Sequence, residues 1–231
     1  MSNTERFIES WKKVEHFAQM FYKQGEKFKE GELAHVLKKD FDSNKVEYCR
    51  EFRNLVQHKL IFFGVEPTSA MIQFLDGIIN ALENPAKISK IWVPKDKLFT
   101  ASLEDETLLI MNKMQDNNYT HVPILNENEL ITGIFSENTL FQYFAEKGIV
   151  DVGKGTQISE YKEYLPIEKH LSEKFLFVER DTTVYAIKQI FETHFAKGER
   201  IGMIFATHSG KQAEKILGII TPWDVLGKIV V

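Results

Sequence analysis

The chain has 231 residues, of which 43 % are hydrophobic and 27 % are charged, and its formal net charge at pH 7 is -4. This length and apolar content suffice to bury a core in one large or two small domains. The negative net charge argues against a protein that holds DNA or RNA through bulk positive potential. The single cysteine, Cys49, excludes an intramolecular disulfide and disfavours a structural zinc site.

The opening residues, MSNTER, lack the basic-then-apolar pattern of a signal peptide. The longest apolar run, residues 60–65, is far shorter than a membrane span requires. The lone cysteine suits a reducing compartment. Together these features predict a soluble, cytoplasmic protein without a membrane partner.

Residues 1–89 show the apolar spacing of α-helices. Within residues 5–24 the apolar side chains recur at three- and four-residue steps, and they are Phe7, Trp11, Val14, Phe17, Ala18 and Phe21. Further helices are expected at residues 32–39, 44–62 and 68–82, bounded by turn and capping residues. The short connections favour antiparallel neighbours, so this segment is predicted to be a four-helix bundle.

Beyond residue 90 the sequence changes to short β-rich runs, and one pattern occurs twice. Residues 103–114 (LEDETLLIMNKM) align with residues 178–190 (VERDTTVYAIKQI), because each has an acidic turn, a threonine and an apolar helical stripe. A strand follows in each copy, at residues 121–124 and 202–205. This internal repetition predicts two copies of one structural unit.

Each of these strands leads through a polar hairpin tip to a return strand, at residues 130–135 in the first copy and 216–220 in the second. Each return strand runs into a helix, so the order βαββα is expected twice. The polar segment 149–170 is interpreted as the link between the copies. We therefore expect an α+β protein with a first copy at residues 90–148 and a linker plus second copy at residues 149–231.

The turn into the last helix carries the same kind of motif in both copies. Residues 218–224 read GIITPWD and residues 133–139 read GIFSENT. A Ser or Thr at such a turn caps the helix and, with the backbone N–H groups there, offers hydrogen-bond donors to a phosphate. An Asp one turn later can accept hydrogen bonds from both hydroxyls of a ribose. The second copy has both groups, in Thr221 and Asp224.

Together with the repeat, this motif makes residues 90–231 resemble a pair of tandem CBS domains, also called a Bateman module. The resemblance implies two halves packed as a pseudo-two-fold pair. It also implies that AMP, ATP or S-adenosylmethionine sits in a cleft between them, with the base against apolar strand residues. Thr221 and Asp224 match the family pattern, and His121 and Val122 belong to the strand that lines the cleft, where contact with the ligand is expected.

The first copy departs from the pattern, because Ser136 stands in the place of Thr221 and Thr139 in the place of Asp224. A hydroxyl is a weaker, non-ionic acceptor for a ribose diol. We therefore expect one competent nucleotide site and a second that is weak, empty or altered in its ligand. A structural interpretation is also open, since Thr221 as N-cap, Pro222 at the first helical position and Asp224 in the first turn stabilise a helix without any ligand.

The third expected helix carries the sequence FRNLVQH at residues 52–58. It resembles the Arg-polar-x-x-x-His signature of HEPN domains, helical bundles that often act as metal-independent ribonucleases. The resemblance implies a site at a two-fold interface, where His58 serves as general acid or base, Arg53 stabilises phosphate charge and Asn54 orients the site. The structural alternative is a solvated His58 and an Arg53 whose stem covers the apolar stripe.

We expect a regulatory protein that binds an adenine nucleotide or S-adenosylmethionine in the CBS cleft, signals to the helical domain and forms a homodimer. On this hypothesis the protein is not an enzyme, needs no cofactor and binds no metal, because the sequence contains no motif for a metal site. The alternative is a nucleotide-regulated, metal-independent endoribonuclease, for which RNA is a further partner. A third possibility is that both parts only build an oligomer.

Overall fold

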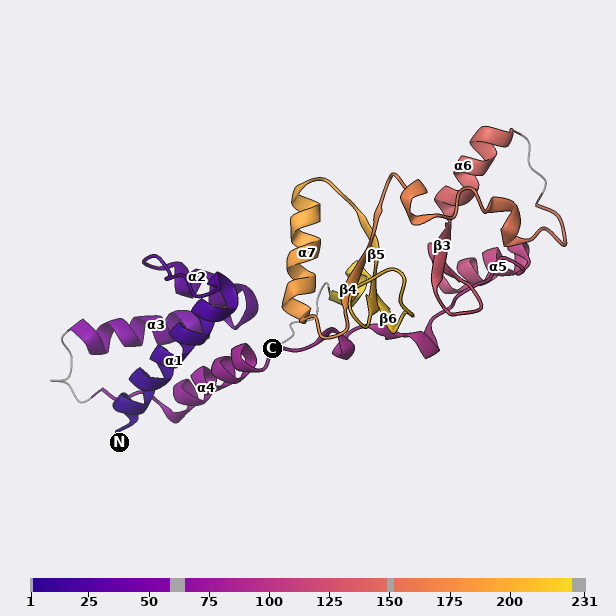
Figure 1. Ribbon diagram of the computed structural model, residues 1–231. Helices are drawn as coiled ribbons and strands as arrows, with labels where there is room; N and C mark the ends of the chain where they lie inside the picture. The colour runs from indigo at the N-terminus through magenta and orange to yellow at the C-terminus, as the bar shows by residue number, and fades with distance from the viewer. Residues whose placement is uncertain (1, 59–64, 149–151, 226–231) are drawn as a thin grey trace. The chain divides into compact units, whose positions relative to one another are not determined.

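The computed structural model describes residues 2–58, 65–148 and 152–225. The chain divides into two compact units, with the boundary between Ala86 and Lys87 (Figure 1). Each unit has its own buried core, so each is described by itself. The mixture of helix and sheet that the sequence predicts is confirmed.

The first unit contains the four helices that the apolar periodicity predicts. They are α1 (Asn3–Lys23), α2 (Glu32–Asp40), α3 (Ser43–His58) and α4 (Ser69–Glu83). The expected end of the third helix, at residue 62, lies outside the described residues. Local caps set the helix starts. In α1, Ser2 Oγ accepts a hydrogen bond from the backbone N–H of Glu5, and the Glu5 carboxylate accepts one from the backbone N–H of Ser2.

One apolar stripe from each helix fills the core of the first unit. Phe7 and Val14 of α1, Leu37 of α2 and Leu75 of α4 are fully buried. Cys49 of α3 belongs to the same core, and burial raises the pKa of its thiol to about 11. The lone cysteine is therefore a small core side chain and not a reactive thiol.

The second unit contains six strands and four α-helices among its described residues. The strands are β1 (Val93–Pro94), β2 (His121–Leu125), β3 (Ile131–Ser136), β4 (Lys174–Glu179), β5 (Ile201–Thr207) and β6 (Gly218–Ile220). The helices are α5 (Thr107–Asn117), α6 (Glu137–Lys147), α7 (Val184–Ala196) and α8 (Pro222–Val225). Figure 1 shows α7 beside the sheet of β4, β5 and β6, and α5 and α6 beside β3.

The strands form a four-stranded sheet in the order β1-β6-β5-β4 and a separate hairpin of β2 and β3. The strand β5 is parallel to β4 and antiparallel to β6. The βαββα pattern alone does not say where the first strand pairs. In the structure β1, which precedes the hairpin in the chain, adds to β6, and the backbone N–H of Lys95 donates to the carbonyl of Leu217 over 3.0 Å.

A comparable backbone contact lies beside the hairpin, where the N–H of Ile134 donates to the carbonyl of Leu165 over 2.8 Å. Both approaches need glycine. A Cβ on Gly133 would lie 2.5 Å from the carbonyl oxygen of Leu165, and one on Gly218 would lie 2.8 Å from that of Val93. Gly133 and Gly218, the first residues of the two turn motifs, therefore permit a neighbouring segment to pack against the return strand.

The hairpin and the four-stranded sheet share a hydrophobic core. Ile131 and Ile134 of β3 pack with Phe175 of β4 and with Met203 and Phe205 of β5. Because this core joins the hairpin to the sheet, the two sets of strands form one compact unit.

The described part of segment 149–170 does more than connect. Ile158, Tyr161 and Leu165 are buried in a second core with Val122 and Phe135 of the hairpin. The many polar residues of this segment predict a link between the two copies. These apolar side chains instead make it a cover for the outer face of the hairpin.

Candidate functional site

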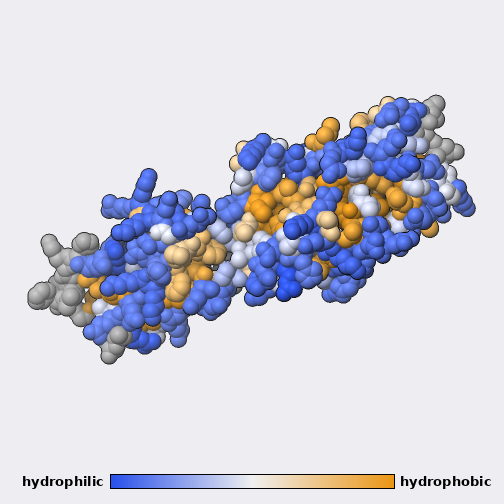
Figure 2. All heavy atoms as spheres, in the orientation of Figure 1, coloured by the Kyte–Doolittle hydropathy of each residue, from blue (hydrophilic) through white to orange (hydrophobic). Residues whose placement is uncertain are grey.

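A cavity of about 1020 Å³ opens in the second unit, which is the size of a site for a small organic ligand. Its wall includes the residues around β1, the start of β2, the start of β5 and the turn after β6. Three of the predicted ligand contacts, His121, Thr221 and Asp224, line this cavity. On the face shown in Figure 2, apolar side chains gather over the strands of the same unit.

Asp224 lies in the first turn of α8, just after Thr221 at the end of β6. Its Oδ2 accepts two hydrogen bonds from Thr221, one from the backbone N–H and one from Oγ1, both over 2.8 Å. The Asp224 carboxylate thus caps the backbone N–H of Thr221 at the start of α8, while the Thr221 hydroxyl donates to that carboxylate and does not itself accept from a helix N–H in the described part of the chain. Within the described residues, however, Oδ1 of Asp224 has no hydrogen-bond partner. One carboxylate oxygen therefore holds the turn, while the other is available as an acceptor.

Apolar side chains form most of the cavity wall, and the buried members are Ile201, Met203 and Ile219. Phe99 and Tyr119 stack on each other with their ring centroids 6.0 Å apart. Trp223 also lines the cavity, and 83 % of its surface is exposed. Flat apolar walls beside a few polar groups suit a purine base.

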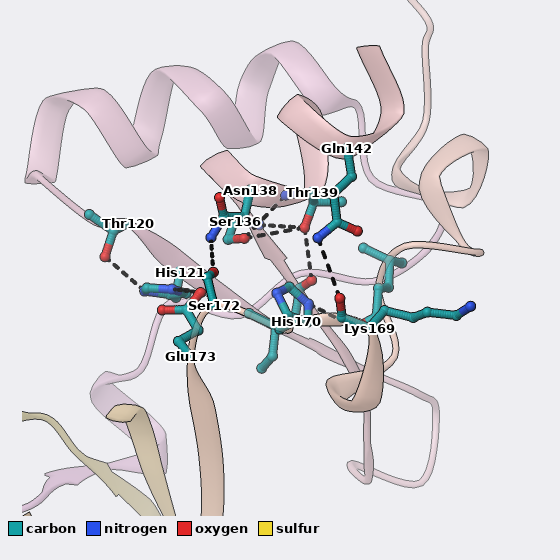
Figure 3. Close-up of polar contacts among 12 residues, drawn as sticks. Thr120, His121, Ser136, Asn138, Thr139, Gln142, Lys169, His170, Ser172 and Glu173 are labelled. Carbon is teal, nitrogen blue, oxygen red and sulfur yellow. Dashed lines mark hydrogen bonds and ion pairs between the residues drawn. The ribbon is translucent and has the colours of Figure 1, made fainter. Parts of the chain in front are cut away.

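His121 brings a polar ring to the cavity and is held from both sides (Figure 3). Its Nδ1 lies 2.8 Å from Thr120 Oγ1, and its Nε2 lies 2.8 Å from Glu173 Oε1. The side chains of His121 and Glu173 are only 15 % and 11 % exposed. Burial alone would raise the pKa of Glu173. The hydrogen bond and charge of His121, with smaller contributions from His170 and Asn138, outweigh burial, so the pKa of Glu173 lies below its ordinary value. Glu173 is therefore ionised at neutral pH.

The sequence pattern does not identify Glu173 as a cavity residue. It lies directly before β4, and 52 residues separate it from His121. A single acidic residue before an apolar strand forms no motif. Gly202 carries the one available signal, because a glycine inside an apolar strand marks a close approach. A Cβ on Gly202 would lie 2.9 Å from Glu173 Oε2.

His170 lies buried behind this pair, with 4 % of its surface exposed. Its Nε2 lies 3.3 Å from the carbonyl oxygen of Leu165, and its ring packs edge-on against Phe175 with the centroids 5.3 Å apart. The ring of His121 packs edge-on against the same phenyl group, at 5.5 Å. Burial lowers the pKa of His170, so its imidazole is neutral at pH 7.

The turn between β3 and α6 in the first copy is closed. Thr139 Oγ1 accepts a hydrogen bond from the backbone N–H of Ser136 over 3.0 Å, and Ser136 Oγ accepts one from the backbone N–H of Thr139 over 3.3 Å. Thr139 Oγ1 also donates to the carbonyl of Ile134 over 3.3 Å. Both side chains are buried, so these groups satisfy one another and not a ligand.

The other three predicted ligand contacts, Ser136, Thr139 and Val122, lie away from this cavity. For Ser136 and Thr139 the sequence predicts a second site that is weak, empty or altered in its ligand. Ser136 and Thr139 complete a helix cap, and Val122 points into the core of the hairpin, where it is fully buried. None of the three lines the cavity. The physical reason is that their polar or apolar groups already find partners inside the protein.

A segment of the chain also crosses this first turn (Figure 3). Asn138 Nδ2 donates to Ser172 Oγ over 2.7 Å, and Gln142 Nε2 donates to the carbonyl of Lys169 over 3.3 Å. These contacts tie the segment before β4 to the first turns of α6. The polar groups at the start of α6 are thereby occupied.

In the first unit, α3 places Arg53 beside Asn54, and Arg53 Nη1 donates to Asn54 Oδ1 over 3.1 Å. The Nε of Arg53 is buried and has no hydrogen-bond partner within the described residues. His58 ends α3, and its side chain lies outside the described part of the structure. Arg53 and Asn54 are neighbours in the sequence, so this contact is local and follows from the helix itself.

Over residues 2–58, 65–148 and 152–225, no three His, Cys, Asp or Glu side chains are grouped so that they could hold a metal ion. None of the helices described there has the length and apolar character that a membrane crossing requires.

A search of the curated proteins gave no match. Among solved structures, the chain is similar to CBSX2 in complex with AMP, at 15 % identity and a TM-score of 0.42, covering 61 % of this chain and 93 % of that one. It is also similar to a hemolysin-like protein containing a CBS domain from Oenococcus oeni PSU, at 14 % identity and a TM-score of 0.42, covering 66 % and 96 %.

A third similar structure is the CBS domain of a bacterial CNNM/CorC family Mg²⁺ transporter in complex with ATP, at 16 % identity and a TM-score of 0.44, covering 68 % of this chain and 94 % of that one. Residues 88–146 match the family model described as "CBS domain". This match covers β1 and the first copy of the repeat with its turn motif, and it ends before the second copy. The chain therefore contains a CBS domain, at residues 88–146.

Proposed function

We propose that this protein is a regulatory sensor that binds one adenine nucleotide in the cavity of its second unit. The observation that carries the proposal is the free Oδ1 of Asp224 at the wall of a cavity of about 1020 Å³, beside Thr221 and in a chain with a CBS domain. A carboxylate oxygen that has no hydrogen-bond partner among the described residues, on a side chain that lines a cavity, is the group that a ribose diol needs.

Each part of the cavity has a role in this proposal. Asp224 accepts hydrogen bonds from the ribose hydroxyls, while Thr221 keeps the carboxylate in place. The buried apolar wall packs against the base. Lys97 and Arg200 line the cavity with exposed cationic side chains, which suit a phosphate group.

The proposal gives one nucleotide per chain. In a pseudo-two-fold pair of CBS repeats, the first copy would offer a second site at Ser136 and Thr139. Those hydroxyls are buried and paired with each other, and a ligand would have to break both contacts. The close approach of the Leu165 carbonyl oxygen to Gly133 matches that of the Val93 carbonyl oxygen to Gly218, and this correspondence supports the pseudo-two-fold arrangement.

On this proposal the protein is not an enzyme. The second unit signals to the helical first unit, and the chain forms a cytoplasmic homodimer. Such coupling requires that the nucleotide prefer one of two arrangements of the protein. Native mass spectrometry of freshly purified protein tests the dimer and detects any co-purified nucleotide, and a monomer at micromolar concentration contradicts the dimer.

Isothermal titration calorimetry with AMP, ATP and S-adenosylmethionine tests the binding itself. We expect saturable binding of at least one of them with one site per chain, and a loss of at least about 100-fold in affinity for Asp224→Ala, because the ribose acceptor is removed. Asp116→Ala, an exposed carboxylate on α5, is the matched control and should bind like the wild type. No heat of binding for any of the three ligands, or equal affinity in Asp224→Ala, contradicts the proposal.

A second candidate function concerns the first unit. Arg53 contacts Asn54, and its Nε is buried with no hydrogen-bond partner in the part of the chain that the structure describes, which favours a site that receives a phosphate at α3. The proposal is a HEPN-like, metal-independent endoribonuclease with His58 as general acid or base. Cleavage of a mixed RNA pool in EDTA, lost in His58→Ala and kept in His35→Ala, supports it. Equal cleavage by wild type and His58→Ala, or none by either, rules it out.

A further inference from the structure

Glu173 is a largely buried polar side chain of the cavity that belongs to no sequence motif. Its Oε1 is fixed by His121 Nε2 at 2.8 Å, and the His121 ring is fixed in turn by Thr120 Oγ1 at 2.8 Å. Its Oε2 lies against the backbone of Gly202, where a Cβ would come within 2.9 Å. The carboxylate is therefore held in one orientation at the wall of the cavity, and only 11 % of the side chain is exposed.

The charges that line the cavity are unbalanced. Four carboxylates, Glu173, Glu192, Glu199 and Asp224, stand against two cationic side chains, Lys97 and Arg200. Two of the carboxylates lie beside a histidine, since Glu199 Oε2 is 2.7 Å from His194 Nδ1 and Glu173 Oε1 is 2.8 Å from His121 Nε2. Both cationic side chains are exposed, so water screens them, whereas Glu173 is largely buried and its field is screened less.

We infer that Glu173 determines the charge of the adenine ligand that the cavity accepts, by admitting adenosine or a nucleoside monophosphate and disfavouring a triphosphate. The inference rests on the proposed function, because it concerns the same cavity. One phosphate can be met by Lys97 or Arg200. Two further phosphates bring additional negative charge into a cavity that already carries an excess of carboxylates, and no further cation lines it within the described residues.

The pair of His121 and Glu173 also has a structural role, since it joins β2 to the segment before β4. The test must separate the two roles. Glu173→Gln removes the negative charge but keeps an oxygen that accepts the hydrogen bond from His121 Nε2, so that the contact survives. Specificity by charge predicts a change in the ratio of two affinities. A purely structural role predicts an equal change in both affinities.

Calorimetric titrations with adenosine, AMP and ATP, at the same ionic strength, make the comparison. In the wild type we expect AMP to bind at least about 10-fold tighter than ATP. In Glu173→Gln we expect this ratio to fall at least about 10-fold, mainly through tighter ATP binding. Glu192→Gln removes an exposed carboxylate of the same cavity and should change the ratio by less than about 3-fold, because water screens that charge.

The outcomes distinguish this inference from the proposed function. If ATP binds the wild type as tightly as AMP, or if Glu173→Gln leaves the ratio unchanged, the role of Glu173 is wrong while the nucleotide site stands. If Glu192→Gln shifts the ratio as much as Glu173→Gln, the effect belongs to net charge and not to Glu173. If neither adenosine, AMP nor ATP binds, the proposed function and the inference both fail.

Discussion

The Nε2 of His121 lies 2.8 Å from Oε1 of Glu173, and this contact joins strand β2 of the hairpin to the residue that precedes β4. Both side chains line the cavity that also contains Asp224. The wall of the candidate site is therefore built from segments that meet only when the hairpin packs against the four-stranded sheet. On the proposed function, a nucleotide in the cavity would contact both sets of strands and stabilise their packing.

The backbone of Leu165, in the segment before β4, lies close to Gly133 of β3, and this contact leads to a first prediction. Gly133→Ala should destabilise the second unit by about 1–3 kcal/mol, because the new Cβ would lie 2.5 Å from the Leu165 carbonyl oxygen, which is backbone. Urea denaturation followed by tryptophan fluorescence measures this in a Trp11→Phe background, where the remaining tryptophans, Trp92 and Trp223, belong to the second unit.

The matched control for that substitution is Gly77→Ala in the middle of α4. No atom lies within 4 Å of the new Cβ, and alanine is the better helix former, so we expect the first unit to keep its stability or to gain up to about 1 kcal/mol. Circular dichroism follows this helical unit. A Gly133→Ala protein that unfolds at the wild-type urea concentration contradicts the close packing.

The buried imidazole of His170 makes a prediction about pH. Burial lowers its pKa below the ordinary 6.5, so the unfolded chain takes up the proton more readily than the folded one. The stability of the second unit should therefore fall as the pH drops below about 6.5, and the fall should continue to the pKa of the folded state. The neighbouring charged group, Glu173, has a lowered pKa, so its contribution is lost only at pH values below its ordinary 4.5.

His170→Gln should remove the part of this dependence between pH 6.5 and the onset of carboxylate titration. His208→Gln, an exposed histidine in the loop after β5, should leave it unchanged. Urea titrations between pH 5 and 8 in the Trp11→Phe background measure how steeply the unfolding free energy of the second unit changes with pH. If the stability of the His170→Gln protein depends on pH as steeply as that of the wild type, His170 does not cause the pH dependence.

Cys49 reports on the first unit. Its thiol is 1 % exposed, and burial raises its pKa to about 11, so a thiol reagent at pH 8 should react on the order of 100-fold more slowly with the native protein than with the urea-unfolded chain. Because the chain has one cysteine, the reaction rate measures the opening of the helical core directly. Equal rates in native and unfolded protein contradict the burial of Cys49.

The sequence predicts best what local chemistry decides. The helices of the first unit follow from apolar side chains at helical steps and from caps such as Ser2 with Glu5, which are three residues apart. The turn of Thr221 and Asp224 is equally local, and both residues line the cavity. Periodicity and short motifs describe interactions within one or two helical turns, which explains this agreement.

What the sequence does not predict depends on contacts between distant segments. Glu173 reaches the cavity through His121, 52 residues away. The pairing of β1 with β6 joins Val93 to Ile219, and no periodicity contains that information. The burial of Ser136 and Thr139 likewise depends on how the start of α6 packs against the rest of the unit. A hydroxyl in a motif looks the same in a sequence whether it faces a ligand or a helix cap.

Hydrogen–deuterium exchange of the wild-type protein with and without saturating AMP tests the central claim most directly, because it locates the ligand on the chain. The account predicts slower exchange in the peptides that cover residues 119–124, 200–203 and 218–225, and no change over residues 132–142, where the first turn is closed. Protection confined to residues 132–142, or no protection at 218–225 when AMP is bound, would contradict a nucleotide site built around Asp224.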